Sequence, residues 1–448
     1  MRQEQLPVGP SAPMLFQTAR MVRNPLSYLE QCRREFGDIF TLRIALGTMV
    51  HLTTPANIKV LFTGEPENLL AGEANYNLFG AISGRGTVFT MDGEAHLHRR
   101  RLLSPPFRGE RMLQYTELMR DITEQVIATW PVHRPFALHP YMQQITLRVI
   151  LAAVFGLEVG PQADGLSHLL AMLANVGTSS PLLLMPMLQW DLGRYSPWGR
   201  IVHLLKKTHT ALDLEIGRRR GLNQESGSRE DILSLLLEIK DEEEHPLTDQ
   251  ELRDELIVML LAGHETTGTT LAWVFERILS EPDVLEKIRV ELAAVVGNER
   301  LDRQNIARLE FLEATIKEAM RVRPIMPQAG VRKLAAPFEI AGYKLPAGTL
   351  VANTPHLLHR NPDLYPEPDR FLPERFLRRN VNPYEWTPFG GGVRRCLGMA
   401  FALHEIKVVL ATVFTKIRLR LADSPVKVGR RGFFIAPADG TRVVVVGI

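Results

Sequence analysis

The chain has 448 residues, of which 45% are hydrophobic and 23% are charged, and its formal net charge at pH 7 is +3. Since domains typically contain roughly 100 to 200 residues, this length would allow about three of them, and the composition is that of a globular protein with a large core. The small net charge gives no support for nucleic-acid binding, and two distant cysteines, Cys32 and Cys396, give no disulfide framework and favour a reducing compartment such as the cytoplasm.

The N-terminal part of the chain predicts an extended segment and then a hairpin. Residues 1–15 form a proline-rich segment that we expect to be mobile. The chain has no apolar run of the about 20 residues that a membrane-spanning helix needs, so we expect no membrane anchor. In the stretch DIFTLRIALGTMVHLT (38–53), apolar and polar residues alternate on both sides of Gly47, which predicts a β-hairpin.

The rest of the chain is mostly helical in pattern. From about Ser104 to Val296 the apolar spacing is helical almost throughout. Strand patterns return at Phe338–Ala352, around the turn sequence AGYKLPAGT, and in the C-terminal run TRVVVV. The predicted fold class is mainly α with a small β portion drawn from both ends of the chain, and we expect a single domain over residues 1–448.

The longest predicted helix crosses the whole molecule. Thr248 and Glu251 have the spacing of a capping box, and the helical pattern ends near Ser280, before a proline. At about 1.5 Å per residue the helix is about 48 Å long. Its middle, LIVMLLAG, is apolar on all sides and therefore predicted to be buried, so the polar residues His264 and Glu265 that follow must serve a purpose.

One of the two cysteines lies in an unusual loop, FGGGVRRCLG (389–398). Positive charge and backbone N–H groups stabilise a thiolate, so Cys396 is a candidate metal ligand or nucleophile. A phosphate-binding loop is excluded because no Lys-Ser or Lys-Thr follows the glycines at the required spacing. A zinc protease helix is excluded as well, because the second histidine of that motif would fall at Gly268.

With this loop the sequence resembles the cytochrome P450 monooxygenases, which carry the pattern F-x-x-G-x-R-x-C-x-G. The residues that match it are Phe389, Gly392, Arg394, Cys396 and Gly398. The resemblance implies a cytochrome P450 fold with the long helix across a haem b (iron protoporphyrin IX), whose iron takes the Cys396 thiolate as axial ligand. It further implies that Phe389, Gly392 and Gly398 bind the cofactor, with backbone N–H groups close to the sulfur.

The sequence AGHETT (262–267) lies in the middle of the long helix. The hydroxyl of Thr266 can bond to the carbonyl of Ala262, which would open a notch beside two small residues. The resemblance implies a catalytic acid and alcohol pair, in which Thr266 holds dioxygen by a hydrogen bond and Glu265 is linked to a proton path from solvent. The alternative is a structural kink with a salt bridge to Glu265.

Two further motifs involve charged residues. Glu318 and Arg321 are three apart on a helix, which alone is weak evidence because such pairs contribute only about 0.2 to 0.5 kcal/mol. The resemblance implies that these two residues join Arg375, in the sequence PERF, in a buried structural Glu-Arg-Arg cluster on the haem side. Removal of a buried partner is costly, so we expect Glu318→Ala to give little haem-loaded protein.

Basic residues are also expected to bind the cofactor. His96 and Arg100, four apart on one predicted helix face, match a family signature for the haem propionates, with histidine where many members carry tryptophan. Arg332 and Arg394 match further propionate ligands. The alternative is a solvated basic helix. Four other arginines are either solvated or form a patch that steers an acidic redox partner: Arg99, Arg101, Arg108 and Arg395.

The resemblance covers the whole chain and is nearest to soluble bacterial members. It implies insertion of one oxygen atom from O₂ into a lipophilic small molecule such as a terpenoid or fatty acid, by a monomer that receives electrons from a ferredoxin or flavodoxin with its reductase. Apolar candidates for the substrate pocket are residues 181–188 together with Phe79, Phe89, Ala262, Ile325 and Phe433. Two alternatives remain, a haem-thiolate isomerase or rearrangement enzyme and a non-catalytic haem-binding protein.

Overall fold

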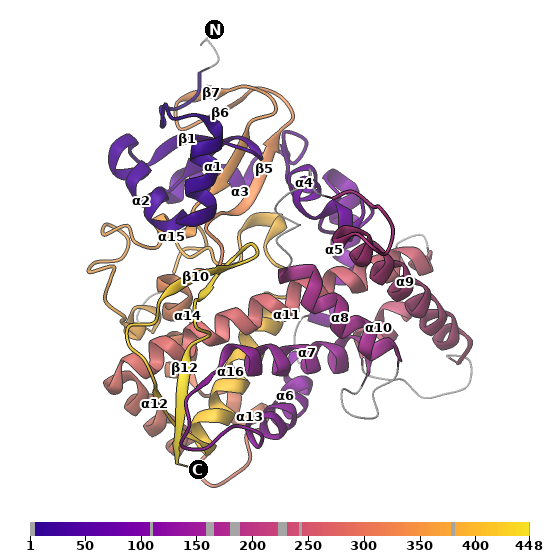
Figure 1. The fold of residues 1–448 in the computed structure, drawn as a ribbon, viewed down its shortest axis with the longest axis vertical. Coiled ribbons are helices and arrows are strands. Elements are labelled where there is room, and N and C mark those ends of the chain that lie inside the picture. The colour runs from indigo at the N-terminus through magenta and orange to yellow at the C-terminus, as the bar shows by residue number, and fades with distance from the viewer. Residues whose placement is uncertain are drawn as a thin grey trace.

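The computed structural model describes residues 5–107, 111–157, 165–179, 189–222, 231–241, 244–377 and 381–447. A β-rich part with helices α1 to α3 lies at one end of the molecule, and a larger helical body forms the rest (Figure 1). The α-helices of the described residues are α1 (Met14–Arg23), α2 (Pro25–Phe36), α3 (Pro55–Thr63), α4 (Ala71–Ser83), α5 (Gly93–Leu103), α6 (Arg111–Ile127), α7 (His139–Phe155), α8 (Gly165–Ser179), α9 (Pro197–Leu222), α10 (Ile232–Glu238), α11 (Asp249–Ser280), α12 (Pro282–Val295), α13 (Arg303–Ala307), α14 (Glu310–Val322), α15 (Pro355–Leu358) and α16 (Met399–Lys416).

The strands are shorter and belong to several small sheets. They are β1 (Ile39–Ile44), β2 (Gly47–Leu52), β3 (Leu69–Leu70), β4 (Phe136–Ala137), β5 (Ala329–Leu334), β6 (Phe338–Ile340), β7 (Tyr343–Leu345), β8 (Leu350–Asn353), β9 (Arg418–Leu421), β10 (Val428–Arg431), β11 (Phe434–Pro437) and β12 (Arg442–Gly447). In the described segments, short 3₁₀ helices are η1 (Pro105–Phe107), η4 (Pro373–Phe376) and η5 (Gly392–Arg394).

Helix α11 is the long helix that the sequence predicts, and it runs across the middle of the molecule (Figure 1). Its 32 residues begin after the capping box, in which Thr248 Oγ1 accepts the backbone N–H of Glu251 while the Glu251 carboxylate accepts that of Thr248. Glycines let α11 approach α7 closely: a Cβ at Gly263 would lie 2.4 Å from Ile150, and one at Gly268 would lie 3.2 Å from Gln143.

The predicted hairpin is confirmed, because β1 and β2 pair antiparallel with Ile39 opposite Leu52. They belong to a five-stranded sheet of order β1-β2-β8-β5-β3, in which β2 and β8 run parallel. The C-terminal strand β12 is also confirmed, but it pairs with β4 and β9 in a separate sheet. The two ends of the chain therefore contribute to different sheets. The sequence does not predict strand β5, because Pro327 lies just before it and Gly330 lies within it, which obscures the strand pattern.

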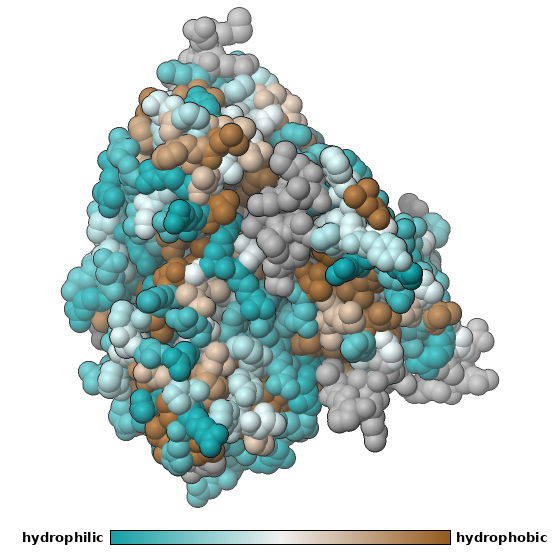
Figure 2. Space-filling view, in the orientation of Figure 1, coloured by the Kyte–Doolittle hydropathy of each residue, from teal (hydrophilic) through white to brown (hydrophobic). Residues whose placement is uncertain are grey.

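The main core lies among α6, α7, α11, α14 and α16, and two smaller apolar clusters lie on opposite faces of the five-stranded sheet. Trp273 and Phe275 of α11 are among the largest buried side chains, and burial of each such residue contributes about 1.5 to 3 kcal/mol. Residues 5–13 hydrogen-bond to the β-rich part, as in the bond from Gln5 N–H to the Lys344 carbonyl. On the face shown in Figure 2, apolar residues gather over α8, between α7 and α9. Among the described residues, no helix is long and apolar enough to cross a membrane.

Candidate active site

Cys396 lies between η5 and α16, and backbone hydrogen bonds fix the shape of its loop. The backbone N–H of Cys396 donates to the Phe389 carbonyl at 3.0 Å. Burial raises the pKa of the Cys396 thiol, whereas the backbone N–H of Gly398 and the positive charge of Arg100 lower it. The side chain nevertheless has accessible surface. The groups that face the sulfur are those that stabilise a thiolate.

The glycines of this loop differ in what requires them. Gly392 has a φ of +62°, and a Cβ there would lie 2.0 Å from the carbonyl oxygen of Phe62 on α3. A Cβ at Gly391 would lie 2.2 Å from the Phe62 ring, so α3 packs directly on the loop. Gly398, by contrast, has a φ of −83°, and a Cβ there would meet no atom of the described residues within 4 Å. Neither backbone conformation nor these neighbours require glycine at 398, which fits a close approach by a bound group.

The predicted cofactor-binding cations come together from three elements. His96 of α5, Arg332 of β5 and Arg394 of η5 line one narrow cavity together with Asp92. Burial first, and then the positive charges of Arg394, Arg100 and Arg332, lower the pKa of His96 to about 3, so this histidine is neutral. Burial likewise lowers the pKa of Arg332 and of Arg394 to about 10 each. The cavity is therefore one in which buried positive charge is costly.

In the described part of the chain, these arginines contact one carboxylate and backbone carbonyls. Arg394 pairs with Asp92 at 2.6 Å, and Arg100 donates to the Arg395 carbonyl at 2.7 Å. Arg332 donates to the carbonyl of Val331 at 3.1 Å and lies over the Phe62 ring. Asp92 also accepts the backbone N–H groups of residues 72 and 73, at the start of α4. One carboxylate thus faces several arginines, and the donor set fits an anionic ligand such as the carboxylates of haem.

The hydrogen bond predicted within the AGHETT segment is present, and the helix is unbroken there. Thr266 Oγ1 donates to the Ala262 carbonyl at 2.6 Å. The side chain of Ala262 is exposed and that of Thr266 half-buried, although both lie in the middle of a buried helix. This face of α11 is therefore left uncovered by the described parts of the chain.

Glu265 lies on another face of α11 and is only 1% exposed. It accepts hydrogen bonds from Gln143 Nε2 of α7 at 2.5 Å and from Thr269 Oγ1 at 3.2 Å. Its Oε1 forms an ion pair with Nε of Arg431 on β10 at 3.1 Å, and His139 Nε2 lies 3.7 Å away. Burial raises the pKa of Glu265, whereas Arg431, Gln143 and Thr269 lower it. The salt bridge of the structural alternative thus exists alongside the notch.

Two members of the Glu-Arg-Arg cluster, Glu318 and Arg321, are buried as the sequence predicts, whereas the side chain of Arg375 is 13% exposed. The side chains of Glu318 and Arg321 are both 0% exposed and form two bonds, at 2.7 and 2.8 Å. Arg321 also donates to three backbone carbonyls of residues 359, 368 and 370. Arg375 Nε lies 3.4 Å from Glu318 Oε1, which is an ion pair without hydrogen-bond geometry. The burial of Glu318 and Arg321 is confirmed, that of Arg375 is only partial, and the role of the cluster in haem incorporation stays a prediction.

Three of the predicted pocket residues are aromatic and meet one another. The ring of Phe79 on α4 lies 5.4 Å from Phe89 and 4.7 Å from Phe433, at the turn between β10 and β11. The carbonyl of Ile325 accepts the backbone N–H of Ile435 on the same hairpin at 2.7 Å, and β11 packs against α11, which carries Ala262. The five residues thus lie on adjoining elements. The predicted pocket segment 181–188 lies outside the described residues.

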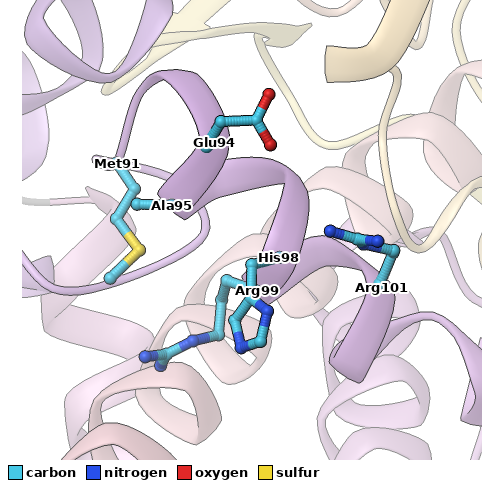
Figure 3. A pocket seen from close by; sticks show the side chains of 6 residues that line it. All are labelled: Met91, Glu94, Ala95, His98, Arg99 and Arg101. Carbon is cyan, nitrogen blue, oxygen red and sulfur yellow. The ribbon is translucent and has the colours of Figure 1, made fainter. Parts of the chain in front are cut away.

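The interpretation of Arg99 as a solvated or partner-steering residue is wrong. Its side chain is buried and pairs with Glu251 and Glu255 of α11. Arg101 and Arg395 are exposed, and Arg108 lies outside the described residues. The other face of α5 borders a surface hollow of about 420 Å³, away from Cys396, in which the side chains fan out and do not converge (Figure 3). Its lining residues are Met91, Glu94, Ala95, His98, Arg99 and Arg101.

The groups that contact Glu265 could not be found from the sequence. Gln143 and His139 come from α7, and Arg431 comes from a strand near the C-terminus. No local pattern marks any of the three, because their only shared property is the side chain that they contact in the folded protein. In the described part of the chain there is no group of three His, Cys, Asp or Glu residues arranged to hold a metal ion.

Comparisons with known proteins identify relatives over nearly the whole chain. Residues 7–438 match the family model for Cytochrome P450. The chain is 37% identical over 416 residues to cytochrome P450 135B1 of Mycobacterium tuberculosis, which covers 92% of this chain and 85% of the relative. It is 36% identical over 442 residues to cytochrome P450 138 of the same species, with 98% and 96% coverage.

Solved structures agree with this assignment. The structure of retinoic acid-bound cyanobacterial CYP120A1 superposes with a TM-score of 0.84 at 25% identity, covering 99% of this chain and all of that one. The haem domain of cytochrome P450DA superposes with a TM-score of 0.87 at 23% identity, covering 100% of this chain and 99% of the other, and this likeness concerns the fold alone.

Proposed function

The chain belongs to the cytochrome P450 family, and from this premise we propose that it inserts one oxygen atom from O₂ into a lipophilic small molecule, with electrons from an external redox partner. Members of the family are haem-thiolate monooxygenases, so its cofactor is iron protoporphyrin IX. The observation that carries the proposal is the geometry of the Cys396 loop, in which Gly392 packs on α3 and the backbone N–H of Gly398 bonds to the sulfur.

The cofactor supplies activation of dioxygen, which a thiolate ligand favours by pushing electron density onto the iron. In this proposal the Cys396 thiolate would hold the haem iron, and the fold of its loop depends on the close packing of Gly392 against α3. Phe389 anchors the loop through the bond that its carbonyl accepts from Cys396 N–H, and Gly398 leaves the space beside the sulfur open.

The cavity lined by His96, Arg332, Arg394 and Asp92, called here the cationic cavity, would hold the two haem propionates. Arg332 and Arg394 bring permanent charge, and the neutral His96 brings a ring N–H donor. Arg100 reaches the same region from one turn further along α5. Two carboxylates would add negative charge to a cavity in which Asp92 already faces Arg394, and charge-assisted hydrogen bonds of this kind are about twice as strong as neutral ones.

Thr266 and Glu265 would handle the proton. The Thr266 hydroxyl donates its hydrogen to the Ala262 carbonyl, so the lone pairs of its oxygen remain to accept a hydrogen bond on the uncovered face of α11. Burial raises the pKa of Glu265 toward the range in which a carboxyl group both takes up and releases protons. The carboxylate points toward α7 and β10, so it must turn to bring a proton to the side of Thr266.

For the substrate we propose a terpenoid or a fatty acid. The rings of Phe79, Phe89 and Phe433 offer an apolar surface, and an apolar cavity with few polar groups is typical of sites for such molecules. The structural neighbour with bound retinoic acid, an isoprenoid carboxylic acid, supports this choice.

For the electron donor we propose a ferredoxin or flavodoxin with its reductase, acting on residues 1–448 as one monomeric domain. Arg395 is exposed and directly precedes Cys396, so it can pair with an acidic partner close to the ligand loop. The rate of reduction by such a partner should fall as the ionic strength rises.

The first test is the carbon monoxide difference spectrum of the dithionite-reduced protein. We expect a Soret band at the strongly red-shifted position peculiar to thiolate-ligated haem, and its loss in Cys396→Ser. Cys32→Ser is the matched control, because Cys32 is buried beneath the N-terminal sheet, away from the loop, and should retain the band. A band at the position of histidine-ligated haem in the wild-type protein would contradict the proposal, as would a band that survives in Cys396→Ser.

A further inference from the structure

Arg431 is the point at which the buried acid of α11 meets the surface. Its Nε lies 3.1 Å from Glu265 Oε1, and its side chain is 38% exposed, whereas that of Glu265 is 1% exposed. The contact lacks the geometry of a directed hydrogen bond, so it is an ion pair. Charge therefore dominates this contact.

The other titratable groups that face Glu265 carry no charge at neutral pH. His139 of α7 lies 3.7 Å from Oε1, and His264 precedes Glu265 on α11. Burial first, and then the positive charge of Arg431, lower the pKa of each histidine to about 4. Within the described residues, Arg431 is thus the cation that faces this carboxylate, while Gln143 and Thr269 contribute neutral donors.

We propose that Arg431 is a positioning residue that keeps Glu265 ionised and turned toward α7 and β10, away from Thr266. The proposal rests on the proposed function, in which Glu265 brings protons to the notch. It assigns a second state to the acid, because Glu265 reaches Thr266 only after it has left the guanidinium. Release of Arg431 to solvent is then the event that frees the carboxyl group.

The place of Arg431 in the chain strengthens this assignment. It is the last residue of β10, and Gly432, with a φ of +55°, turns the chain back into β11. Phe433, next in the turn, contacts Phe79 in the aromatic cluster. The residue that holds the acid and a residue of the proposed substrate pocket therefore share one tight turn, and a displacement of that turn moves both.

The direct test is an infrared titration of the protonated carboxyl band of Glu265. Glu255 and Glu405 are also buried carboxyl groups whose pKa values burial raises, so the Glu265 band is defined as the one lost in Glu265→Gln. An opposite charge at this distance lowers a carboxyl pKa by about 1 to 3 units. In Arg431→Gln we therefore expect the band to persist to a pH higher than in the wild type by about one unit or more.

Two variants separate charge from fold. Arg431→Lys keeps the charge and should restore most of the wild-type titration. Arg430→Gln is the matched control, because Arg430 lies in the same strand and donates to the carbonyls of Gly432 and of residues 21 and 22. It should leave the Glu265 band unmoved. An unchanged midpoint in Arg431→Gln would overturn the proposal, and so would an equal shift in Arg430→Gln, which would mean that a loosened hairpin is the cause.

The proposed function can fail independently of this inference. The infrared titration needs neither turnover nor substrate, so it reports on Arg431 even if the carbon monoxide spectrum shows no thiolate-ligated haem. If that spectrum is as expected, the share of consumed electrons that appears in product should also acquire a different pH profile in Arg431→Gln, with recovery in Arg431→Lys. A profile unchanged from the wild type would contradict the role of Arg431 in catalysis.

Discussion

The hydroxyl of Thr266 lies 2.6 Å from the carbonyl oxygen of Ala262, one turn earlier in α11. The same helix repeats the arrangement one turn later, where Thr270 Oγ1 donates to the carbonyl of Thr266 at 2.8 Å. Only the first of the two opens onto the uncovered face of the helix, because Thr270 is buried. Thr266 is thus the functional candidate, and Thr270, four residues later, is its structural control.

Replacement of Thr266 by alanine should separate electron consumption from product formation. Loss of the hydroxyl removes the acceptor at the notch, and positioned proton transfer contributes about 10² to 10⁴ in rate. We expect product formation to fall by about 10²-fold while consumption of the electron donor falls much less. Thr270→Ala should behave as the wild type in both measurements. Equal losses in the two variants would point to a helix defect, and a non-catalytic haem protein would be indifferent to both changes.

Removal of Glu318 should destabilise the protein and prevent haem loading. The variant Glu318→Ala leaves Arg321 buried with its charge unpaired, which costs about 3 to 5 kcal/mol. The measurements are the midpoint of urea unfolding and the ratio of Soret to protein absorbance. The control is Glu374→Ala on η4, whose pair with Lys287 is largely exposed and is worth at most about 1 kcal/mol. Normal haem content in Glu318→Ala would refute the structural role.

Arg332→Ala should weaken haem retention. A hydrogen bond to a charged group contributes about 1.5 to 3 kcal/mol, so the rate of haem transfer to apomyoglobin should rise by about 10- to 100-fold. Lys333→Ala, the next residue of β5, is the control, because Arg332 lines the cationic cavity and Lys333 does not. If both variants release haem at the wild-type rate, Arg332 does not hold a propionate.

The buried carboxyl group of Glu255 should make the stability of the protein depend on pH. Burial raises its pKa to about 7, against the lowering effects of the Val88 N–H and Arg99. An unfolded glutamate has a pKa of about 4.3, so the folded protein keeps a proton that the unfolded chain has lost between about pH 4.3 and 7. The free energy of unfolding should therefore decrease as the pH rises through this window and then level off.

The variant Glu255→Gln should lack this component. We expect its urea unfolding midpoint, relative to that of the wild type, to be higher at pH 7.5 than at pH 5, because only the wild type loses stability in between. A constant difference between the two proteins across this range would mean that Arg99 keeps Glu255 ionised throughout.

The sequence predicts elements whose signals are local. The start of α11 is correct to the residue because Thr248 and Glu251 satisfy each other within one turn, and the Gly47 hairpin is correct because a strand pattern flanks it on both sides. The Cys396 loop is recognisable because its glycines and arginines are adjacent in sequence.

Contacts between segments that are far apart in the sequence cannot be predicted from such local signals. Arg99 looks like one arginine of a basic run, but the fold buries it against Glu255, which lies 156 residues later. The same holds for the approach of Arg431 to Glu265 and for the pairing of β12 with β4, since strand partners are chosen by the topology of the whole chain. Such partners are fixed by the packing of α7, α11 and the C-terminal hairpins, which no short pattern encodes.

The bonds from Asp92 to the start of α4 have a mechanical consequence. They clamp the first turn of this helix by directed hydrogen bonds, whereas Phe79, near its other end, is held by ring contacts that tolerate sliding. We therefore expect the end of α4 at the aromatic cluster to move more than its clamped first turn. Efforts to widen the range of accepted molecules should begin at that free end, and the clamp itself should be left intact.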